Sequence, residues 1–313
     1  MIRLRVIAPA SHTDATLELL VENTSVANVV VIRGAAVDPT GDVITCDVAP
    51  EDASYIVDDL RRMGLAQLGA IDIDEIGSSL SAASTMAEHS AKGKSADSVI
   101  WENVEARIDN EGLLSGGMVA LFAFAGVIAA VAILIDSAPI VVGAMALCPD
   151  FGPIAAFSIG IVRRDRRRAR GGLLALLIGF ASGIVAAFAA VTLLGVTGIA
   201  PESFDISGNT LAQTIAAPNI YSVVVAACAG AAGMLSVTLG KSGALVGVAV
   251  SITTIPAAAD IGLALSYGDW QSVQGSSMQL ALNIVSLLIA ATLMLAFQRR
   301  RFDRHDKLRR PTS

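Results

Sequence analysis

The sequence predicts a membrane α-helical protein with a small α+β domain in front of its helices. Its 313 residues are 54% hydrophobic and 16% charged, with a mean hydropathy of +0.65, which is too apolar for an ordinary soluble domain. Residues 1–111 hold 19 of the 28 acidic residues but 8 of the 22 basic ones. Six apolar stretches of membrane-spanning length follow this acidic part.

The first 76 residues predict a ferredoxin-like domain with the order βαββαβ. The segment DPTG is a turn signal between two strands. Thr13 and Asp14 are candidate caps of the first helix, and Gly64 follows the second helix. Many functions occur on this fold, so it does not by itself indicate an activity. We expect strands over 3–9, 26–34, 42–48 and 68–76, and helices over 13–24 and 50–64.

Two connecting segments follow this domain. Residues 77–98 are small and polar without apolar periodicity, which predicts a flexible linker. Residues 99–111 place Val99, Ile100, Val104 and Ile108 at helical spacing, which predicts an amphipathic helix. This helix is either a plain connector or a regulatory element.

The six apolar stretches predict a transmembrane domain over 112–298, followed by a basic tail over 299–313. With six crossings, the basic clusters RRDRRRAR, Lys241 and RRRFDRHDKLRR fall on one face, and the opposite connections contain no Lys or Arg. The positive-inside rule therefore predicts cytoplasmic N- and C-termini in a cell (inner) membrane. We expect crossings at 113–135, 138–162, 171–196, 218–240, 243–267 and 278–298.

Two other interpretations of these segments are weaker. Re-entrant loops in place of the second and fifth crossings would move RRDRRRAR to the outside while the basic tail stayed inside, so full but broken crossings are favoured. RRDRRRAR could also bind nucleic acid, but it contains no interleaved aromatic residues. Contact with anionic lipid headgroups explains its arginines more simply.

An internal duplication relates the two halves of the transmembrane domain. A shift of 104 residues superimposes 113–196 on 218–298 without a gap. Seven of the 47 positions between 136 and 182 are then identical, and both middle crossings contain proline. Because each unit has three crossings, the second unit enters the membrane upside down. This inverted repeat is the architecture of many secondary transporters.

The prolines mark the candidate binding site. A broken helix leaves backbone N–H and C=O groups without partners, which a membrane protein tolerates only where protein or a water-filled cavity surrounds them. The exposed helix ends can then coordinate ions or polar solutes. We therefore expect the two broken middle crossings to meet near the axis of the duplication. The candidates for binding a substrate or ion there are Cys148, Pro149, Asp150, Gly152, Pro153, Thr253, Thr254 and Pro256.

Ionisable and amide side chains inside crossings extend this list. Asp150 is either functional or the cap of a half-helix that starts near Phe151. Asp260 and Asn283 are further binding candidates, although Asp260 can lie near the outer surface. Asn283 and Gln279 can line the cavity or, as is commoner, bond between helices. Asp136 and Ser137 are better explained as caps of the second crossing. The small-residue runs AACAGAAG and GFASG predict close helix packing.

The segments IDSAPIVVGAMALCPDFGPI and ALVGVAVSITTIPAAADIGLAL resemble the bacterial and archaeal membrane proteins grouped as domain of unknown function 389. The resemblance covers about 112–298. The chain differs from the family pattern at Cys148, where serine is usual, at Asp150, where an apolar residue is usual, and at Ala257, where a second proline is usual. Its matching positions are Asp136, Ser137, Gly143, Ala144, Met145, Pro149, Gly152, Pro153, Gly247, Val248, Ser251 and Pro256. The resemblance implies an architecture but no biochemistry.

These patterns lead to two functional hypotheses. The first is a secondary transporter or channel-like carrier of a small solute or ion, with the cytoplasmic domain as a regulatory or assembly platform. The second is a membrane-anchored sensor or scaffold whose soluble domain binds a ligand and whose crossings mainly oligomerise. No catalytic constellation, metal-ligand spacing or cofactor motif occurs, so we expect no enzyme, no metal and no cofactor. We expect the lipid bilayer and a second copy of the chain, but not nucleic acid, as partners.

Overall fold

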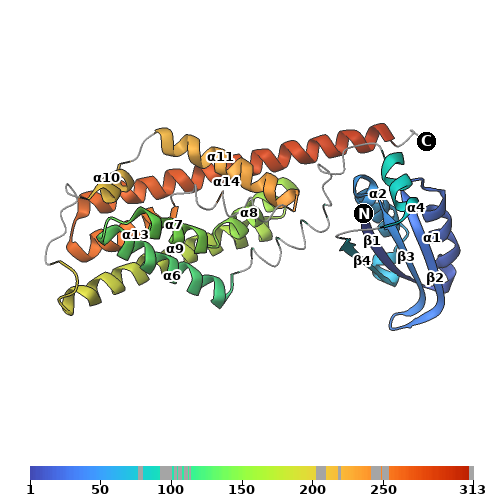
Figure 1. The fold of residues 1–313 in the computed structure, drawn as a ribbon, viewed down its shortest axis with the longest axis horizontal. Coiled ribbons are helices and arrows are strands. Elements are labelled where there is room, and N and C mark those ends of the chain that lie inside the picture. The colour runs from blue at the N-terminus through green and yellow to red at the C-terminus, as the bar shows by residue number, and fades with distance from the viewer. Residues whose placement is uncertain are drawn as a thin grey trace. The chain divides into compact units, whose positions relative to one another are not determined.

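The computed structural model separates the chain into two compact units, Met1–Val104 and Glu105–Ser313. Each unit has its own fold (Figure 1). The structure describes residues 1–76, 80–91, 101, 104, 108, 112, 114–201, 209–217, 220–240, 248 and 254–309.

The first unit contains a four-stranded antiparallel sheet with the strand order β2-β3-β1-β4. Two helices connect the strands in the predicted order βαββαβ, with one additional short helix, α3, before β4. This order and strand pairing are those of the ferredoxin-like pattern. The elements are β1 (Ile2–Ala8), α1 (Ala10–Glu22), β2 (Val26–Val37), β3 (Thr40–Val48), α2 (Pro50–Arg62), α3 (Leu65–Leu68) and β4 (Ala70–Glu75).

Alternation along the strands builds the core of this unit. Leu4 and Val6 of β1 are fully buried, whereas the alternating Arg3 and Arg5 point to the other face. Arg3 forms an ion pair with Asp47, and Arg5 forms one with Asp72. The two long helices pack their apolar faces on the same side as Leu4, adding α1 and α2 residues to one hydrophobic cluster. The sheet therefore has one dry face and one face of ion pairs.

Two local predictions for the first unit were wrong. Helix α1 begins at Ala10, earlier than expected, so Thr13 is no cap: its Oγ1 donates to Asp42 Oδ2 at 2.7 Å. Within the predicted flexible linker, residues 82–90 form helix α4 (Ala82–Ser90), capped by Ser81. This helix contacts β2 and β3, and Ser84 bonds Asn28. Tertiary contacts therefore order a segment that has no apolar periodicity of its own.

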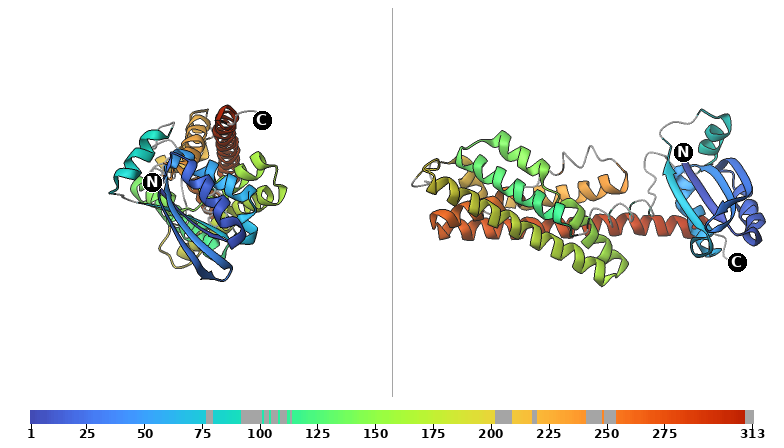
Figure 2. Two further views of the ribbon diagram at one scale, coloured as in Figure 1. Left: turned by 90° about the vertical axis from the view of Figure 1, so that its right-hand side faces the viewer. Right: turned by 90° about the horizontal axis from the view of Figure 1, so that it is seen from below.

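The second unit is made of helices that run side by side along its length (Figure 2). The predicted connector at 99–111 is described at Trp101 and Val104, which end the first unit, and at Ile108 of the second unit. All three are helical and buried; Val99 and Ile100 lie outside the described residues. The helices of the unit are α6 (Gly116–Leu134), α7 (Ala138–Leu147), α8 (Phe151–Arg163), α9 (Arg166–Val196), α10 (Thr210–Ala216), α11 (Ile220–Thr238), α13 (Thr254–Tyr267) and α14 (Trp270–Arg309).

Four of these helices, α6, α9, α11 and α14, are long and apolar enough to cross a membrane. Helices α7 and α8 form an apolar pair that is bent by 47° at the break, the geometry of a broken span or of a re-entrant loop. The predicted fifth crossing, 243–267, is described at Val248 and over α13 only. Large apolar side chains such as Leu177 and Leu193 are 56% and 64% exposed, which fits a surface that contacts lipid. The chain is therefore a membrane protein with several apolar helices.

Helix ends in the second unit recur at an offset of 104 residues. Helix α6 spans 116–134 and α11 spans 220–238, while α9 begins at Arg166 and α14 at Trp270. The caps recur too: Asp165 Oδ1 accepts from the amides of residues 167 and 168, and Asp269 Oδ1 accepts from those of 271 and 272. Positive φ angles also recur at the matched positions 136 and 240, and 164 and 268.

Helices α6 and α9 run in the opposite direction to their equivalents α11 and α14. Helices α6 and α9 both end near α10, whereas α11 and α14 run away from it (Figure 1). Hydrogen bonds hold this end together: Asn209 Nδ2 donates to the Ile133 carbonyl at 2.6 Å, and Tyr267 OH donates to the Pro201 carbonyl at 3.0 Å. The ends of α6, α9 and α13 therefore meet at the same end of the unit.

Glycines allow the closest helix contacts, as the small-residue runs predict. Gly126 of α6 lies directly against the backbone of Gly183 in α9, and Gly230 of α11 lies against the Leu287 carbonyl of α14. Both pairs occupy equivalent positions at the 104-residue offset. A side chain at either glycine would collide with backbone, so the prediction of close packing at AACAGAAG and GFASG is confirmed.

Candidate functional site

The candidate site begins at the break between α7 and α8. Helix α7 ends at Leu147 and α8 begins at Phe151. Pro149 disfavours helical backbone in the residue before it, and Cys148 is extended accordingly, with φ −70° and ψ 121°. Pro153 lies in the first turn of α8, where a missing N–H leaves no helical hydrogen bond unmade. The two prolines thus explain the break that they predict.

Asp150 lies at this break and is buried, with 3% of its surface exposed. The residue occupies the position before α8, but its side chain makes no cap hydrogen bond, so the alternative role as a helix cap is wrong. Its Oδ2 instead accepts a hydrogen bond of 2.8 Å from Thr254 Oγ1. The carboxylate therefore links the break in α7–α8 to the first turn of α13.

Thr254 is 1% exposed and is followed by Pro256, which is also buried. Thr253 lies outside the described residues. Asp150 and Thr254 are 104 residues apart, so they are equivalent positions in the internal duplication and contact each other directly. The structure thus brings the two proline-containing segments together, as the sequence predicts.

The other candidates near the break contribute to packing. Cys148 is buried, and its amide donates to the Ala144 carbonyl at 3.2 Å. Pro149 and Gly152 are partly exposed, and the Gly152 carbonyl lies close to Gly112. The Pro153 carbonyl packs against Gly172 of α9.

Asp260 and Asn283 form a second group, on α13 and α14. Asp260 Oδ2 accepts a hydrogen bond of 2.5 Å from Ser276 Oγ, and Asn283 Oδ1 accepts one of 3.3 Å from Gln279 Nε2. Both residues are 1% exposed, so their side chains are buried inside the unit. The sequence analysis considered Gln279 together with Asn283 but did not include Ser276. The spacing of Ser276 with Gln279 and Asn283 along one face of a helix is the signal that could have identified it.

Asp136 and Ser137 do not act as side-chain caps of α7. Ser137 occupies the cap position but makes no cap hydrogen bond. Asp136, which has a φ of +49°, accepts a hydrogen bond of 3.1 Å from the Leu211 amide at the start of α10. The carboxylate therefore attaches α10 to the end of α6, a contact between segments that are distant in sequence.

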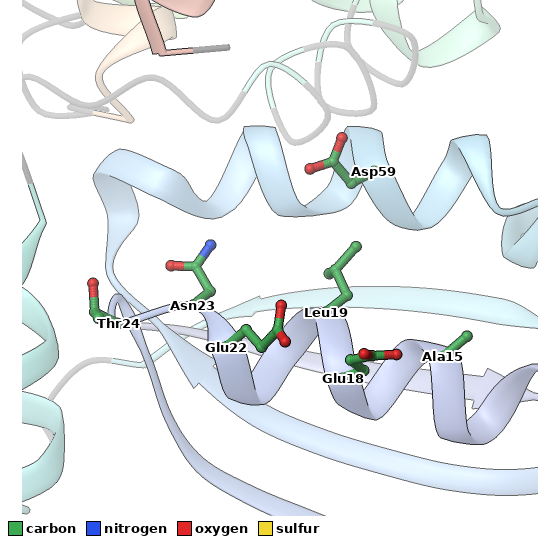
Figure 3. Close-up of a pocket in the computed structure, with 7 residues that line it drawn as sticks. All are labelled: Ala15, Glu18, Leu19, Glu22, Asn23, Thr24 and Asp59. Carbon is green, nitrogen blue, oxygen red and sulfur yellow. The ribbon is translucent and has the colours of Figure 1, made fainter. Parts of the chain in front are cut away.

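The first unit has an open pocket of about 580 Å³ between α1 and α2 (Figure 3). Three of its side chains, Glu18, Glu22 and Asp59, are acidic. Within the ranges that the structure describes, no three His, Cys, Asp or Glu side chains gather in a geometry for a metal ion. The remaining lining residues are Ala15, Leu19, Asn23 and Thr24.

Comparison with known proteins identifies a family. The model of the family described as Domain of unknown function (DUF389) matches residues 145–289. This segment contains both Asp150 and Thr254, as well as Asp260 and Asn283, and the match confirms the resemblance drawn from the sequence. No curated protein and no solved structure matches the chain.

Proposed function

We propose that this chain, whose residues 145–289 match the model of the DUF389 family, is a transporter or channel-like carrier of a small solute or ion. Its transmembrane domain consists of two three-crossing repeats, 113–196 and 218–298, with opposite orientations. The first unit is a cytoplasmic platform for regulation or for assembly with a second copy. The chain is not an enzyme in this proposal, and it needs no cofactor.

The direction of the helices supports three crossings in each repeat. Because α6 and α9 run the same way, the segment between them must return across the full length of the unit (Figure 1). The bend of 47° between α7 and α8 deflects this return path but does not reverse it. Helices α11 and α14 likewise run in the same direction as each other (Figure 1). Three crossings per repeat then require the second repeat to be inverted.

The contact between Asp150 and Thr254 carries the proposal. Two equivalent positions of a duplicated unit touch each other only when both lie close to the axis that relates the two copies. Here this contact is a buried hydrogen bond, and it joins a helix break to the first turn of α13. A carboxylate inside a membrane domain is costly, and such residues therefore usually have a function. Broken helices at a repeat axis are where carriers bind their substrates.

The contact also describes a closed state of the carrier. Both side chains are almost fully buried and bonded to each other, so the route between the repeats is shut at this level. Alternating access requires the two repeats to rock against each other around such a point. Transport in this proposal therefore includes a step in which Asp150 and Thr254 separate.

The basic residues support cytoplasmic termini. Ser158 of α8 bonds Thr292 of α14 at 3.2 Å, and both helices continue from there toward their arginines. Arg163 and Arg164 therefore lie at the same end of the helical unit as Arg299–Arg301. A concentration of arginines at one end is typical of the cytoplasmic side of a cell membrane.

Flux into lipid vesicles tests the proposal. The full chain is reconstituted and offered Na⁺, K⁺, H⁺, Cl⁻ and small organic acids and amines. We expect at least one to move faster than in protein-free vesicles. Thr254→Val should raise that flux by roughly tenfold, because about 1.4 kcal/mol is lost from the closed state with one hydrogen bond. Asp150→Asn retains the acceptor oxygen but loses the charge, and should reduce the flux of a cation.

Ser182→Ala is the matched control, because its hydroxyl donates to the Val119 and Gly179 carbonyls, which both lie in the same repeat as Ser182. This variant should keep the flux of the unmodified protein. If none of the offered solutes moves, or if Asp150→Asn and Thr254→Val behave like Ser182→Ala, the carrier proposal is abandoned.

The acidic pocket between α1 and α2 favours a second candidate, a membrane-anchored sensor whose soluble unit binds a cationic ligand (Figure 3). Thermal-shift measurements on residues 1–104, which form a compact unit with its own core, separate the two functions. A stabilising cationic ligand that acts on this fragment, combined with no flux through the full chain, would favour the sensor.

A further inference from the structure

One face of helix α14 is polar over residues 272–283. Ser272, Ser276, Gln279 and Asn283 follow one another at spacings of four, three and four residues, which places them on a single stripe. All four are at most 5% exposed. The opposite face is apolar and open to the surroundings, with Met278, Val285 and Ile289 between 53% and 59% exposed. The helix thus presents its polar face to the protein.

Asp260 of α13 lies against this stripe through its hydrogen bond to Ser276. Its second oxygen, Oδ1, is buried and has no hydrogen-bond partner among the described residues. The same holds for Gln279 Oε1, whose amide nitrogen is bonded to Asn283. Burial of an unpaired acceptor costs roughly 1–3 kcal/mol, and more for a charged group. The two buried oxygens, one on α13 and one on α14, therefore lack a donor among the described residues.

The first repeat provides an internal comparison. At the offset of 104 residues, the positions of Asp260, Ser276, Gln279 and Asn283 correspond to Ala156, Gly172, Ala175 and Gly179. There the helices simply pack together: Gly172 lies against the Pro153 carbonyl and Gly179 against the ring of Phe122. The architecture therefore does not require polar residues at these positions, and their presence in the second repeat needs another explanation.

We propose that Asp260, Ser276, Gln279 and Asn283 form a binding site for a dehydrated monovalent metal cation. All ligands of the site are oxygens, which suit hard cations such as Na⁺ and K⁺. A single positive charge neutralises the one carboxylate, whereas a divalent ion usually takes several carboxylates. The cation supplies the partner that Asp260 Oδ1 and Gln279 Oε1 lack.

The stripe also leads into the membrane. At a rise of 1.5 Å per residue, Ser276 lies about 9 Å and Asn283 about 20 Å from the start of α14 at Trp270. That start is at the end of the unit opposite to Arg299–Arg301. A cation bound here therefore enters from the non-cytoplasmic side, and its role as the coupling or transported ion rests on the carrier function proposed above.

Thermal unfolding of the purified full chain in detergent tests the site. Samples contain NaCl, KCl or N-methyl-D-glucamine chloride at constant total ionic strength. We expect a saturable rise in Tm with Na⁺ or K⁺ that the large organic cation does not produce. Asp260→Asn should abolish this rise. Gln279→Leu should weaken the apparent affinity by about tenfold, as expected for one lost ligand.

Two features separate binding from a merely structural role. Asp260→Asn should have an unchanged or higher Tm in N-methyl-D-glucamine chloride, because the variant removes an uncompensated buried charge. A structural defect would lower Tm in every salt and leave the cation-dependent rise intact. Asp165→Asn, which changes an exposed acid at the cap of α9, should keep the full rise. Should Asp260→Asn fail to fold, Ser276→Ala, which removes only a hydroxyl, takes its place.

The proposal is overturned if neither Na⁺ nor K⁺ raises Tm, or if the rise survives in Asp260→Asn or Ser276→Ala. Its failure can be told apart from failure of the carrier function. A cation-dependent rise in Tm without any flux would support the cation site and contradict the carrier function. Flux without a cation-dependent rise in Tm would support the carrier function and contradict the cation site.

Discussion

The two halves of the helical unit share their helix ends but differ in what fills the space between the helices. Asp165 and Asp269 cap equivalent helices with equivalent hydrogen bonds. The helices that follow them have different interiors: glycine and alanine in the first half, and serine, glutamine and asparagine in the second. Backbone geometry can therefore stay the same in two copies while the side chains between the helices diverge. Features that both halves share, such as the helix caps, indicate a structural role. Features that only one half has, such as the polar residues of α14, indicate a functional role.

The largest effect is expected where both halves rely on the same glycine contact. Gly126→Ala and Gly230→Ala should each lower the free energy of unfolding by about 3 kcal/mol, because a Cβ at either position collides with backbone of the partner helix. Unfolding in detergent at increasing denaturant concentration measures both. Clearly unequal losses would break the comparison, since they would mean that the two helix pairs do not pack alike.

A smaller effect, which differs between the two halves, is expected at Gly275 and Gly171. These glycines are equivalent in sequence but have different surroundings. Gly275→Ala should cost about 2 kcal/mol, because its Cβ would strike the Ala216 carbonyl of α10. At the equivalent position, Gly171→Ala meets open space and should raise helix stability by up to about 1 kcal/mol. Comparison of the two Tm values checks this, and equal shifts would contradict the role assigned to α10.

The smallest effect concerns the helix caps. Asp165→Ala and Asp269→Ala should each cost about 1 kcal/mol, the usual contribution of a side chain that accepts from the first amides of a helix. Chemical denaturation of the two variants in parallel provides the measurement. A loss in one variant alone would show that the recurrent hydrogen bonds differ in strength despite their matched geometry.

Much of this architecture could be predicted from local patterns. Alternating apolar residues predicted the strands of the first unit, and long apolar stretches predicted α6, α9, α11 and α14. Pro149 and Pro153 predicted the break before α8, because proline limits the backbone of its neighbour and cannot donate a hydrogen bond. These inferences hold since each depends on residues that are close together in the chain.

Other features depended on partners that are far away in sequence. Whether Asp150 is functional or caps α8 was open, and the structure shows a hydrogen bond to Thr254, 104 positions away, in place of a side-chain cap. Asp136 and Ser137 were interpreted as caps, but the former attaches α10. Residues 82–90 have no apolar periodicity, yet they form α4, which contacts the sheet.

The sequence by itself determined that the chain is a membrane protein with a small α+β domain, where its helices break, and how its two halves align. Those properties follow from hydropathy, proline chemistry and spacing, which are local. Only the tertiary structure decided which polar groups meet inside the protein and which oxygens remain without a donor. A buried polar atom takes whichever partner the packing of distant helices brings within about 3 Å, and no local pattern encodes that choice.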